Sequence, residues 1–304
     1  MLEERTVFVN GEFLPWDKAR THMMSHSFAR GSAIFEVLGF HETRGGPAVF
    51  RLDEHIKRLF RTAELLDMEL PATEDSLKES VLETIRRNSL REGMIKILGY
   101  YPQVSMGILP STRVVDISIF VMDLLEDLGG LAFPFEEGTT LCISRWRKLD
   151  PQTVPIEAKV AANYLNGMMA RKEAETRGFE HAVMLDTQGF IAEGGTESIF
   201  LVHEGVLMTP CQGTVLQSIT RESIIQAAKF IGVECLEGRL HPKRLMEADE
   251  VFLSGTPMKV LPVRTVEERP MEGVPGPLTK RFFDLMDSIV KGKDERFKEW
   301  LFPI

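Results

Sequence analysis

One lysine in this chain has the surroundings that a reactive amine needs. Lys159 lies between Ala158 and Val160, and two more alanines follow, so its neighbours along the chain are small and largely apolar. A lysine forms a Schiff base readily only when part of it is neutral, which burial or a neighbouring charge can bring about. Taken alone, a lysine at a strand-to-helix junction is more often exposed and unreactive. The chemistry therefore depends on partners elsewhere in the sequence.

Two further residues fit the electronic needs of an aldehyde cofactor held by such a lysine. Glu193 ends a strand-like run just before Gly194-Gly195. Pyridoxal phosphate needs a carboxylate opposite its ring nitrogen, because a protonated ring is the better electron sink. Tyr164 could hydrogen-bond the phenolic oxygen of that cofactor. Taken singly, a glutamate in water at a turn and a buried aromatic residue are the simpler interpretations.

Three segments offer hydrogen-bond donors for a phosphate group. Ser218-Ile219-Thr220 comes at the start of a predicted helix over 220–231, and the first amides of a helix are unpaired and carry partial positive charge. Ser254-Gly255-Thr256 follows a predicted strand and forms a second donor-rich turn, and Arg58 could add a bidentate grip. Each is common alone, since Ser and Thr at a helix start are usually plain N-caps. Their order and combination are unusual.

These motifs, in this order, resemble those of the fold-type IV (class IV) pyridoxal-phosphate aminotransferases, in particular the branched-chain amino acid aminotransferases. The lysine, glutamate and Ile-Thr-Arg segments carry most of the specificity. The matching segments, which span nearly the whole chain, are Met24-Ser25-His26, Phe35-Glu36, Glu54-His55-x-x-Arg58-Leu59, Met106-Gly107, Glu157-Ala-Lys159-x-x-x-Asn163-Tyr164-Leu165, Ala192-Glu193-Gly194-x-x-Glu197-Ser198-Ile199-Phe200, Ile219-Thr220-Arg221, Ala248-Asp249-Glu250-Val251-Phe252 and Ser254-Gly255-Thr256.

The resemblance implies an α+β fold, pyridoxal 5′-phosphate as cofactor, and a role for each matching residue. The expected fold is a small α+β domain and a larger pseudo-barrel domain of the D-amino acid and branched-chain aminotransferase type. Lys159 would form the Schiff base and shuttle a proton between the substrate α-carbon and C4′ of the cofactor. Glu193 would pair with the ring nitrogen and Tyr164 with the phenolic oxygen. The residues expected to hold the phosphate are Arg58, Ile219, Thr220 and Thr256.

The substrate wall implied by the resemblance departs from the family pattern at three positions. Similar branched-chain enzymes usually carry tyrosine at position 30, tyrosine at 94 and arginine at 96, where this chain has Arg30, Met94 and Lys96. Arg30 brings a permanent charge, and it either binds a substrate carboxylate or points outward into a surface ion pair. The neighbouring Phe35-Glu36 match fixes the register and slightly favours the first interpretation. The full set of expected substrate-binding residues is Arg30, Phe35, Met94, Lys96, Met106 and Gly107.

The function predicted from the sequence is amino-group transfer between an aliphatic, branched-chain-like amino acid and 2-oxoglutarate by ping-pong kinetics. Two alternatives use the same fold and lysine: a D-amino acid or amine transaminase, and 4-amino-4-deoxychorismate lyase. A cofactor-free binding protein with this fold is a further alternative. The resemblance also implies a homodimer or a higher homo-oligomer, because the loop at Met106-Gly107 of family members reaches the partner's active site.

Composition excludes several other classes of protein. The 304 residues carry a formal net charge of −9 and no local cluster of basic residues, which argues against nucleic-acid binding. Cys142, Cys211 and Cys235 show no spacing typical of a metal site or a disulfide framework, so no metal is expected. Without a signal peptide or an apolar run long enough for a membrane span, we expect a cytoplasmic protein with no membrane partner.

The elements that must position these residues follow from hydrophobic periodicity and turn signals. A hairpin is predicted over 6–14 around Asn10-Gly11, and strands over 33–40, 48–50, 94–101 and 114–122, with helices from 52 to 66 and over 74–91. The second half should hold strands at 139–146, 181–186, 189–192, 197–203, 206–209 and 249–253, and helices over 161–177, 220–231 and 277–291. We therefore expect a small domain over 1–123, a linker over 124–136 and a large domain over 137–304.

Overall fold

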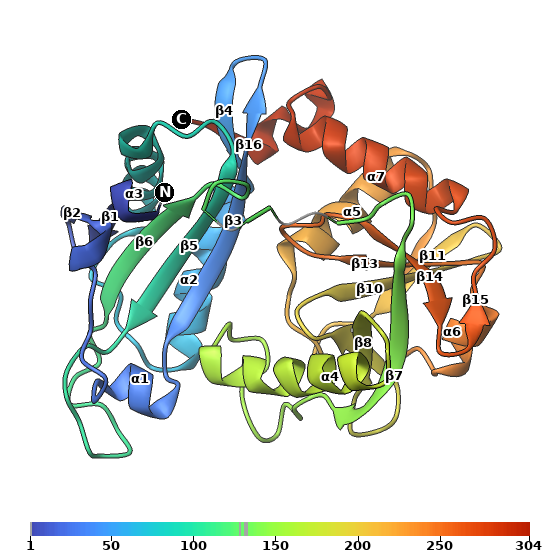
Figure 1. The fold of residues 1–304 in the computed structure, drawn as a ribbon, viewed down its shortest axis with the longest axis horizontal. Coiled ribbons are helices and arrows are strands. Elements are labelled where there is room, and N and C mark those ends of the chain that lie inside the picture. The colour runs from blue at the N-terminus through green and yellow to red at the C-terminus, as the bar shows by residue number, and fades with distance from the viewer. Residues whose placement is uncertain (1, 128, 131–132) are drawn as a thin grey trace. The chain divides into compact units, whose positions relative to one another are not determined.

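The computed structural model describes residues 2–127, 129–130 and 133–304, and these form two compact units (Figure 1). Unit 1 contains Met1–Leu131, Ala158–Ala162 and Ser288–Ile304, and unit 2 contains Ala132–Glu157 and Asn163–Asp287. Each unit is a sheet with helices of its own, so the predicted α+β architecture is confirmed. Two segments expected in the large domain, 158–162 and 288–304, belong instead to unit 1. Residues 128 and 131–132 of the expected linker lie outside the described residues.

Unit 1 is built on a seven-stranded sheet in which every neighbouring pair is antiparallel. The Asn10-Gly11 turn of the first hairpin has positive φ at both residues, as a two-residue hairpin requires. The strands, in spatial order, are β16 (Leu301–Pro303), β4 (Gly46–Phe50), β3 (Ile34–Thr43), β5 (Gly93–Tyr100), β6 (Asp116–Met122), β1 (Thr6–Val9) and β2 (Glu12–Pro15).

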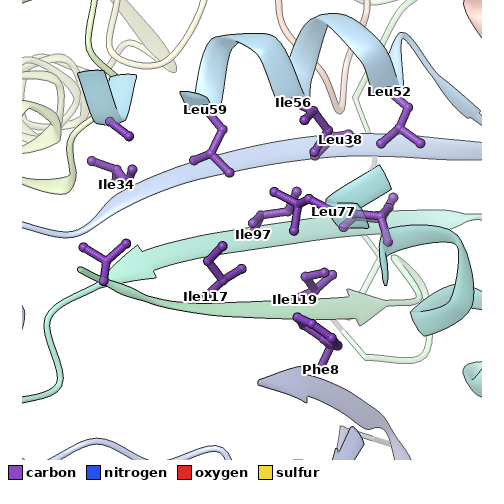
Figure 2. Close-up of a cluster of buried hydrophobic side chains, with 14 of the residues drawn as sticks. Phe8, Ile34, Leu38, Leu52, Ile56, Leu59, Leu77, Ile97, Ile117 and Ile119 are labelled. Carbon is purple, nitrogen blue, oxygen red and sulfur yellow. The ribbon is translucent and has the colours of Figure 1, made fainter. Parts of the chain in front are cut away.

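Two amphipathic helices cover one face of this sheet and form the core of unit 1. Helix α2 (Leu52–Leu65) turns Leu52, Ile56 and Leu59 toward the sheet at the spacing of successive helical turns (Figure 2). Helix α3 (Glu74–Asn88) starts with a reciprocal cap between Thr73 and Ser76 and ends at Ser89, earlier than predicted, because Ser89 takes a left-handed conformation. The short helix α1 (His26–Arg30) was not predicted.

The segment that carries Lys159 is bound to unit 1 through the start of β3. Its backbone pairs with that strand: Phe35 N donates to Lys159 O at 3.1 Å, and Ala161 N donates to Ala33 O at 2.8 Å. Ala158 and Val160 are buried in the same hydrophobic core as α2 and β3. The backbone of the lysine segment is therefore hydrogen-bonded to the start of β3, a long, central strand that lies more than a hundred residues earlier in the sequence.

Unit 2 is built on a second, mixed sheet that curls on itself. The end strand β9 approaches β10 and β11 as well as its partner β8, which gives the predicted pseudo-barrel its half-closed form. The strands, in spatial order, are β12 (Cys235–Gly238), β11 (Val206–Pro210), β10 (Ser198–His203), β13 (Glu250–Ser254), β14 (Leu261–Val266), β7 (Thr139–Arg147), β8 (His181–Leu185) and β9 (Ile191–Gly194), with β15 (Arg269–Pro270) beside β14.

Helix α4 (Tyr164–Thr176) packs on β7 and β8 through small residues. Its buried positions are Gly167, Ala170 and Ala174, whereas Leu165 and Met168 are 60% and 57% exposed. The large apolar side chains of Leu165 and Met168 thus lie on its outer face. The remaining helices are α5 (Ile219–Phe230), α6 (Lys243–Glu247) and α7 (Pro277–Val290), of which α6 was not predicted.

In the part of the chain that the structure describes, no helix is both long enough and apolar enough to cross a membrane.

Candidate functional site

The residues singled out from the sequence fall into two groups, one in each unit. The lysine group, in unit 1, contains Lys159, Arg58 and the whole of the expected substrate wall. The glutamate group, in unit 2, contains Glu193, Tyr164 and the two donor-rich turns.

Lys159 is a buried lysine rather than an exposed one. The residue is 9% exposed, and its backbone N–H donates to the hydroxyl of Thr62 on α2 at 3.2 Å. Its Nζ lies 4.7 Å from the centre of the Phe35 ring. A shielded amine of this kind is what a Schiff-base lysine needs.

A buried ion-pair cluster supports the lysine group: Glu36 on β3 with His55 and Arg58 on α2. The two carboxylate oxygens of Glu36 accept hydrogen bonds from Arg58 Nε and Nη2 at 2.7 and 2.6 Å, and Oε2 also accepts from His55 Nδ1 at 2.7 Å. Burial alone would raise the pKa of the Glu36 carboxyl, but Arg58 and then His55 outweigh burial and lower the pKa to about 2. Glu36 therefore remains a carboxylate at neutral pH.

His55 completes this cluster as a neutral imidazole. Burial lowers its pKa below the usual value, and the charges of Arg58 and Lys159 add to this, against the raising effect of Glu36. Glu36 and His55 belong to two of the segments that carry the family resemblance, but the sequence alone indicates no role for them. The spacing of His55 and Arg58, three apart on one helix face, was the signal that could have found the cluster.

Arg58, expected at the phosphate, has part of its guanidinium committed to Glu36. A guanidinium has five N–H donors, and Glu36 receives two of them. The Arg58 side chain is 11% exposed, and its ion pair with Glu36 holds the guanidinium in place within unit 1.

The expected substrate-wall residues on β3 and β5 differ in exposure. Lys96 is exposed, and its Nζ lies 5.4 Å from the centre of the Phe35 ring, the same ring that Lys159 contacts. Met94, two residues earlier on β5, is buried opposite Gly39. The structure thus brings Phe35, Lys96 and Lys159 together. Met94 is buried on the same face of the sheet as Lys96, because side chains two residues apart on a strand point to the same side.

Arg30 and the Met106-Gly107 loop are joined by a hydrogen bond. Arg30 Nη2 donates to the carbonyl oxygen of Met106 at 3.1 Å, and one helical turn earlier His26 Nε2 bonds to the carbonyl oxygen of Ile108, also at 3.1 Å. Helix α1 therefore fixes the loop 104–109 at two carbonyls. The loop side chains point to solvent: Met106, Ile108 and Leu109 are 77%, 78% and 76% exposed.

Glu193, in the glutamate group, is a buried carboxylate with a partner that the sequence did not reveal. Lys148 Nζ lies 2.5 Å from Glu193 Oε1, and Leu216 N donates to Glu193 Oε2 at 3.3 Å. No local pattern marks Lys148, because it meets Glu193 only through the pairing of β7, β8 and β9.

Tyr164 is positioned by a close backbone contact between α4 and the turn after Glu193. A Cβ on Gly167 would lie 2.1 Å from the carbonyl oxygen of Gly195, so the helix approaches this turn more closely than any side chain would allow. Tyr164 starts the same helix one turn before Gly167. Tyr164, Gly195 and Thr196 all line one surface cavity of about 510 Å³.

The two donor-rich turns belong to one edge of the sheet of unit 2. Strands β11 and β13 both run antiparallel to β10, so both end at the edge where β10 starts. Helix α5 starts after β11, with the Ser218 hydroxyl accepting from Arg221 N and with Ile219 and Thr220 buried. β13 ends at Ser254, whose buried hydroxyl has no hydrogen-bond partner among the described residues. Thr256 follows two residues later, in the turn after this strand.

No group of His, Cys, Asp or Glu side chains in the described ranges is arranged to hold a metal ion.

The family model described as amino-transferase class IV matches residues 33–266. The chain belongs to this family. Curated relatives include the branched-chain-amino-acid aminotransferases of Salmonella typhimurium and Escherichia coli, each 35% identical, over 98% and 97% of this chain and 97% and 96% of theirs. The family resemblance and the enzyme class predicted from the sequence are thereby confirmed.

Solved structures of the family share the whole fold. The T.th. branched-chain amino acid aminotransferase complexed with N-(5′-phosphopyridoxyl)-L-glutamate matches with a TM-score of 0.93 and 32% identity, over 100% of this chain and 99% of that one. The branched-chain aminotransferase of Thermoproteus uzoniensis with norvaline matches with a TM-score of 0.93 and 30% identity, over 98% and 99%. The predicted two-domain fold of this enzyme type is confirmed.

Proposed function

We propose that this aminotransferase moves an amino group between a branched-chain or similar aliphatic amino acid and 2-oxoglutarate, with pyridoxal 5′-phosphate held covalently by Lys159. The observation that carries the proposal is the burial of Lys159 against Phe35. The substrate classes are supported by the ligands of the related structures, an adduct of glutamate in one and aliphatic norvaline in the other.

The chain has the groups that this cofactor requires. Its aldehyde needs a shielded lysine, its ring nitrogen needs a carboxylate, and its phosphate needs donors. Lys159 and Glu193 are both buried, and Ser254 carries a buried hydroxyl without a partner among the described residues, beside the expected phosphate turn. These residues fit the cofactor.

When bound, pyridoxal phosphate supplies an electron sink for the charge that develops at the substrate α-carbon. Lys159 Nζ would hold the cofactor and then move one proton between the α-carbon and C4′. Glu193 would keep the ring nitrogen protonated, and the Tyr164 hydroxyl would hydrogen-bond the phenolic oxygen. Ile219, Thr220 and Thr256, with Arg58, would bind the phosphate through amide, hydroxyl and guanidinium donors.

The substrate would meet the lysine group. Phe35 would form an apolar wall for an aliphatic side chain, and Lys96, whose ammonium faces the same ring as Lys159, would receive a carboxylate. Lys96 offers a point charge instead of the planar fork of arginine, which makes carboxylate binding less dependent on geometry.

A half-reaction screen tests this function. The purified holoenzyme is mixed with single L- or D-amino acids or primary amines, and formation of pyridoxamine 5′-phosphate is followed by absorbance. We expect L-valine, L-leucine and L-isoleucine to react and 2-oxoglutarate to restore the starting spectrum. Lys159→Ala should lose both the absorption of the covalently held cofactor and turnover. Reaction with D-amino acids or amines alone, or pyruvate release without an amino acceptor, would reject the proposal in favour of the transaminase or lyase alternatives.

We further propose that the chain acts as a homodimer or a larger homo-oligomer, in which the loop 104–109 contacts a second copy. The four exposed apolar side chains of this loop, Val104, Met106, Ile108 and Leu109, support it, because such groups gain stability when a partner removes them from water. Ile108→Asp should shift the protein toward the monomer in light scattering. Leu125→Asp, at a side chain that is equally exposed but outside the loop, is the control. A monomeric wild type would refute the proposal.

A further inference from the structure

Lys148 and Glu193 form a nearly buried ion pair in unit 2. The two groups lie 2.5 Å apart, and each side chain is 11% exposed. Lys148 follows β7, and its backbone N–H donates to Leu185 O on β8 at 2.8 Å, which fixes its main chain. The pair therefore joins the end of β7 to β9 across the intervening strand β8.

The carboxylate of Glu193 is fixed from two sides. Oε1 faces the Lys148 ammonium, and Oε2 accepts the hydrogen bond from the backbone of Leu216. Both contacts come from the protein itself, so the orientation of the carboxylate does not depend on a bound molecule. A lone buried carboxylate is costly, and removing one partner of a buried pair is strongly destabilising because the other charge loses its compensation.

We propose that Lys148 is a positioning residue for Glu193: it balances the charge of the buried carboxylate and holds it in the orientation in which it receives the ring nitrogen of the cofactor. The proposal rests on the proposed function of Glu193. Lys148 itself touches neither substrate nor cofactor in this scheme. Its second effect is electrostatic, because a positive charge beside Glu193 opposes the positive charge on a protonated ring nitrogen and so limits how tightly that proton is held.

Four variants test this role: Lys148→Met, Lys148→Arg, the double variant Lys148→Met with Glu193→Gln, and the control Lys243→Met. Lys243 pairs with Glu247 at 3.1 Å but is 76% exposed, so its loss should change little. For each variant, thermal unfolding of the apoenzyme and titration of the apoenzyme with pyridoxal 5′-phosphate are measured. The absorption spectrum of the bound cofactor is then recorded as a function of pH.

We expect Lys148→Met to lower the apoenzyme melting temperature and to weaken cofactor binding by about tenfold or more, by analogy with the loss of outer-shell partners in other sites. Lys148→Arg should restore most of both. The double variant should melt higher than Lys148→Met, because no carboxylate is then left without compensation. The pH dependence of the cofactor spectrum should shift in Lys148→Met, which a purely structural role for the lysine would not cause.

Wild-type cofactor affinity and an unchanged spectrum in Lys148→Met would overturn the proposal, as would additive effects of the two substitutions on melting. If Lys148→Met does not fold, the melting temperature and the cofactor affinity of Lys148→Arg and of the double variant are compared instead. A folded double variant would show that the uncompensated carboxylate of Glu193 causes the loss, and an unfolded one would overturn the proposal. Failure of the wild type to bind pyridoxal phosphate would instead refute the proposed function, while the melting temperatures of the apoenzymes would still report whether Lys148 and Glu193 are coupled.

Discussion

Glu36 and Glu42 offer a comparison of the same interaction in two environments on one strand. Both lie on β3 and both make two hydrogen bonds to an arginine, Glu36 to Arg58 and Glu42 to Arg91. Glu36 is fully buried, whereas the pair of Glu42 is open to water. Buried charges depend on their partners far more than exposed ones, because water cannot replace the lost interaction.

We therefore predict that Glu36→Gln destabilises the protein by about 3–5 kcal/mol, since it leaves the Arg58 charge without compensation. Glu42→Gln, the matched control, should change the free energy of unfolding little. Urea unfolding of the two variants beside the wild type measures both values. Similar losses in the two variants would show that burial does not set the strength of these pairs.

The same cluster predicts how stability depends on pH. The pKa of Glu36 is lowered in the folded state to about 2, and that of His55 is lowered as well, so at acidic pH the unfolded chain binds more protons than the folded one. Stability should be complete above the usual pKa of His55 and fall as the pH drops below it, and further between about 4.5 and 2 as Glu36 is protonated. The difference between wild type and Glu36→Gln should shrink across that second range. A constant difference down to pH 3 would contradict the assignment.

Functional residues could be predicted from the sequence where their neighbours along the chain form a pattern. Residues whose role depends on a partner distant in the sequence could not. Lys159 lies among small residues, and Glu193 precedes a glycine pair, so both could be singled out. Lys148 could not, because its partner Glu193 is 45 residues away and meets it only through strand pairing. The charge environment of a buried site is a property of the fold.

Helix α4 shows how one missing side chain positions an element. Because Gly167 lies against the backbone of Gly195, the helix sits close to the turn that follows Glu193. In an ordinary helix interior, alanine in place of glycine stabilises by up to about 1 kcal/mol. Here the added methyl would meet a backbone oxygen that cannot rotate away, so the sign should reverse.

We predict that Gly167→Ala lowers the melting temperature and moves α4 outward, with a loss of cofactor affinity through Tyr164. Gly238→Ala is the control, because an added Cβ there meets nothing within 4 Å. Differential scanning calorimetry and cofactor titration test the two changes together. A Gly167→Ala protein more stable than the wild type would mean that the close approach does not hold the helix.

Helix α1 gives Arg30 a role that neither interpretation of the sequence included. Its guanidinium donates to the carbonyl oxygen of Met106, so we predict that Arg30→Ala frees one of the two side-chain anchors of the loop 104–109 while His26 keeps the other. Limited proteolysis should then cut within this loop several-fold faster. Arg44→Ala, in the exposed turn between β3 and β4, is the control. Unchanged cleavage in Arg30→Ala would show that the hydrogen bond does not restrain the loop.

Elements with a clear period were predicted, and those without one were not. The hairpin at Asn10-Gly11 and helix α2 follow directly from turn chemistry and spacing. Helix α1, β12, β14 and β16 were missed because they are short or lack alternation, and their formation depends on neighbouring strands. The buried face of α4 could not be foreseen, since it follows from the approach of Gly167 to Gly195.

At the scale of the whole molecule, the two units are built from segments that are not consecutive in the sequence. A division at the acidic, glycine-containing segment was expected, but 158–162 and 288–304 belong to unit 1, although part of unit 2 precedes each of them in the chain. In the C-terminal segment, β16 pairs with β4, and the ring of Trp300 packs against Phe50 and Phe297. Pairings between segments so far apart in the chain leave no local signal, because they depend on how distant strands meet.

Because of these contacts, we expect the C-terminal segment to stabilise unit 1. Trp300 is buried, its carbonyl oxygen accepts a hydrogen bond from Arg51 N at 2.7 Å, and the Arg51 guanidinium lies 4.6 Å from its ring centre. We predict that Trp300→Ala costs about 3–5 kcal/mol, as for other buried aromatic residues, whereas Trp146→Ala, at a partly exposed tryptophan of unit 2, costs markedly less. Chemical denaturation measures both. Equal, small losses of unfolding free energy in the two variants would mean that the C-terminal segment covers unit 1 without stabilising it. Of the segments 158–162 and 288–304, only the one that carries Lys159 would then contribute to the core of unit 1.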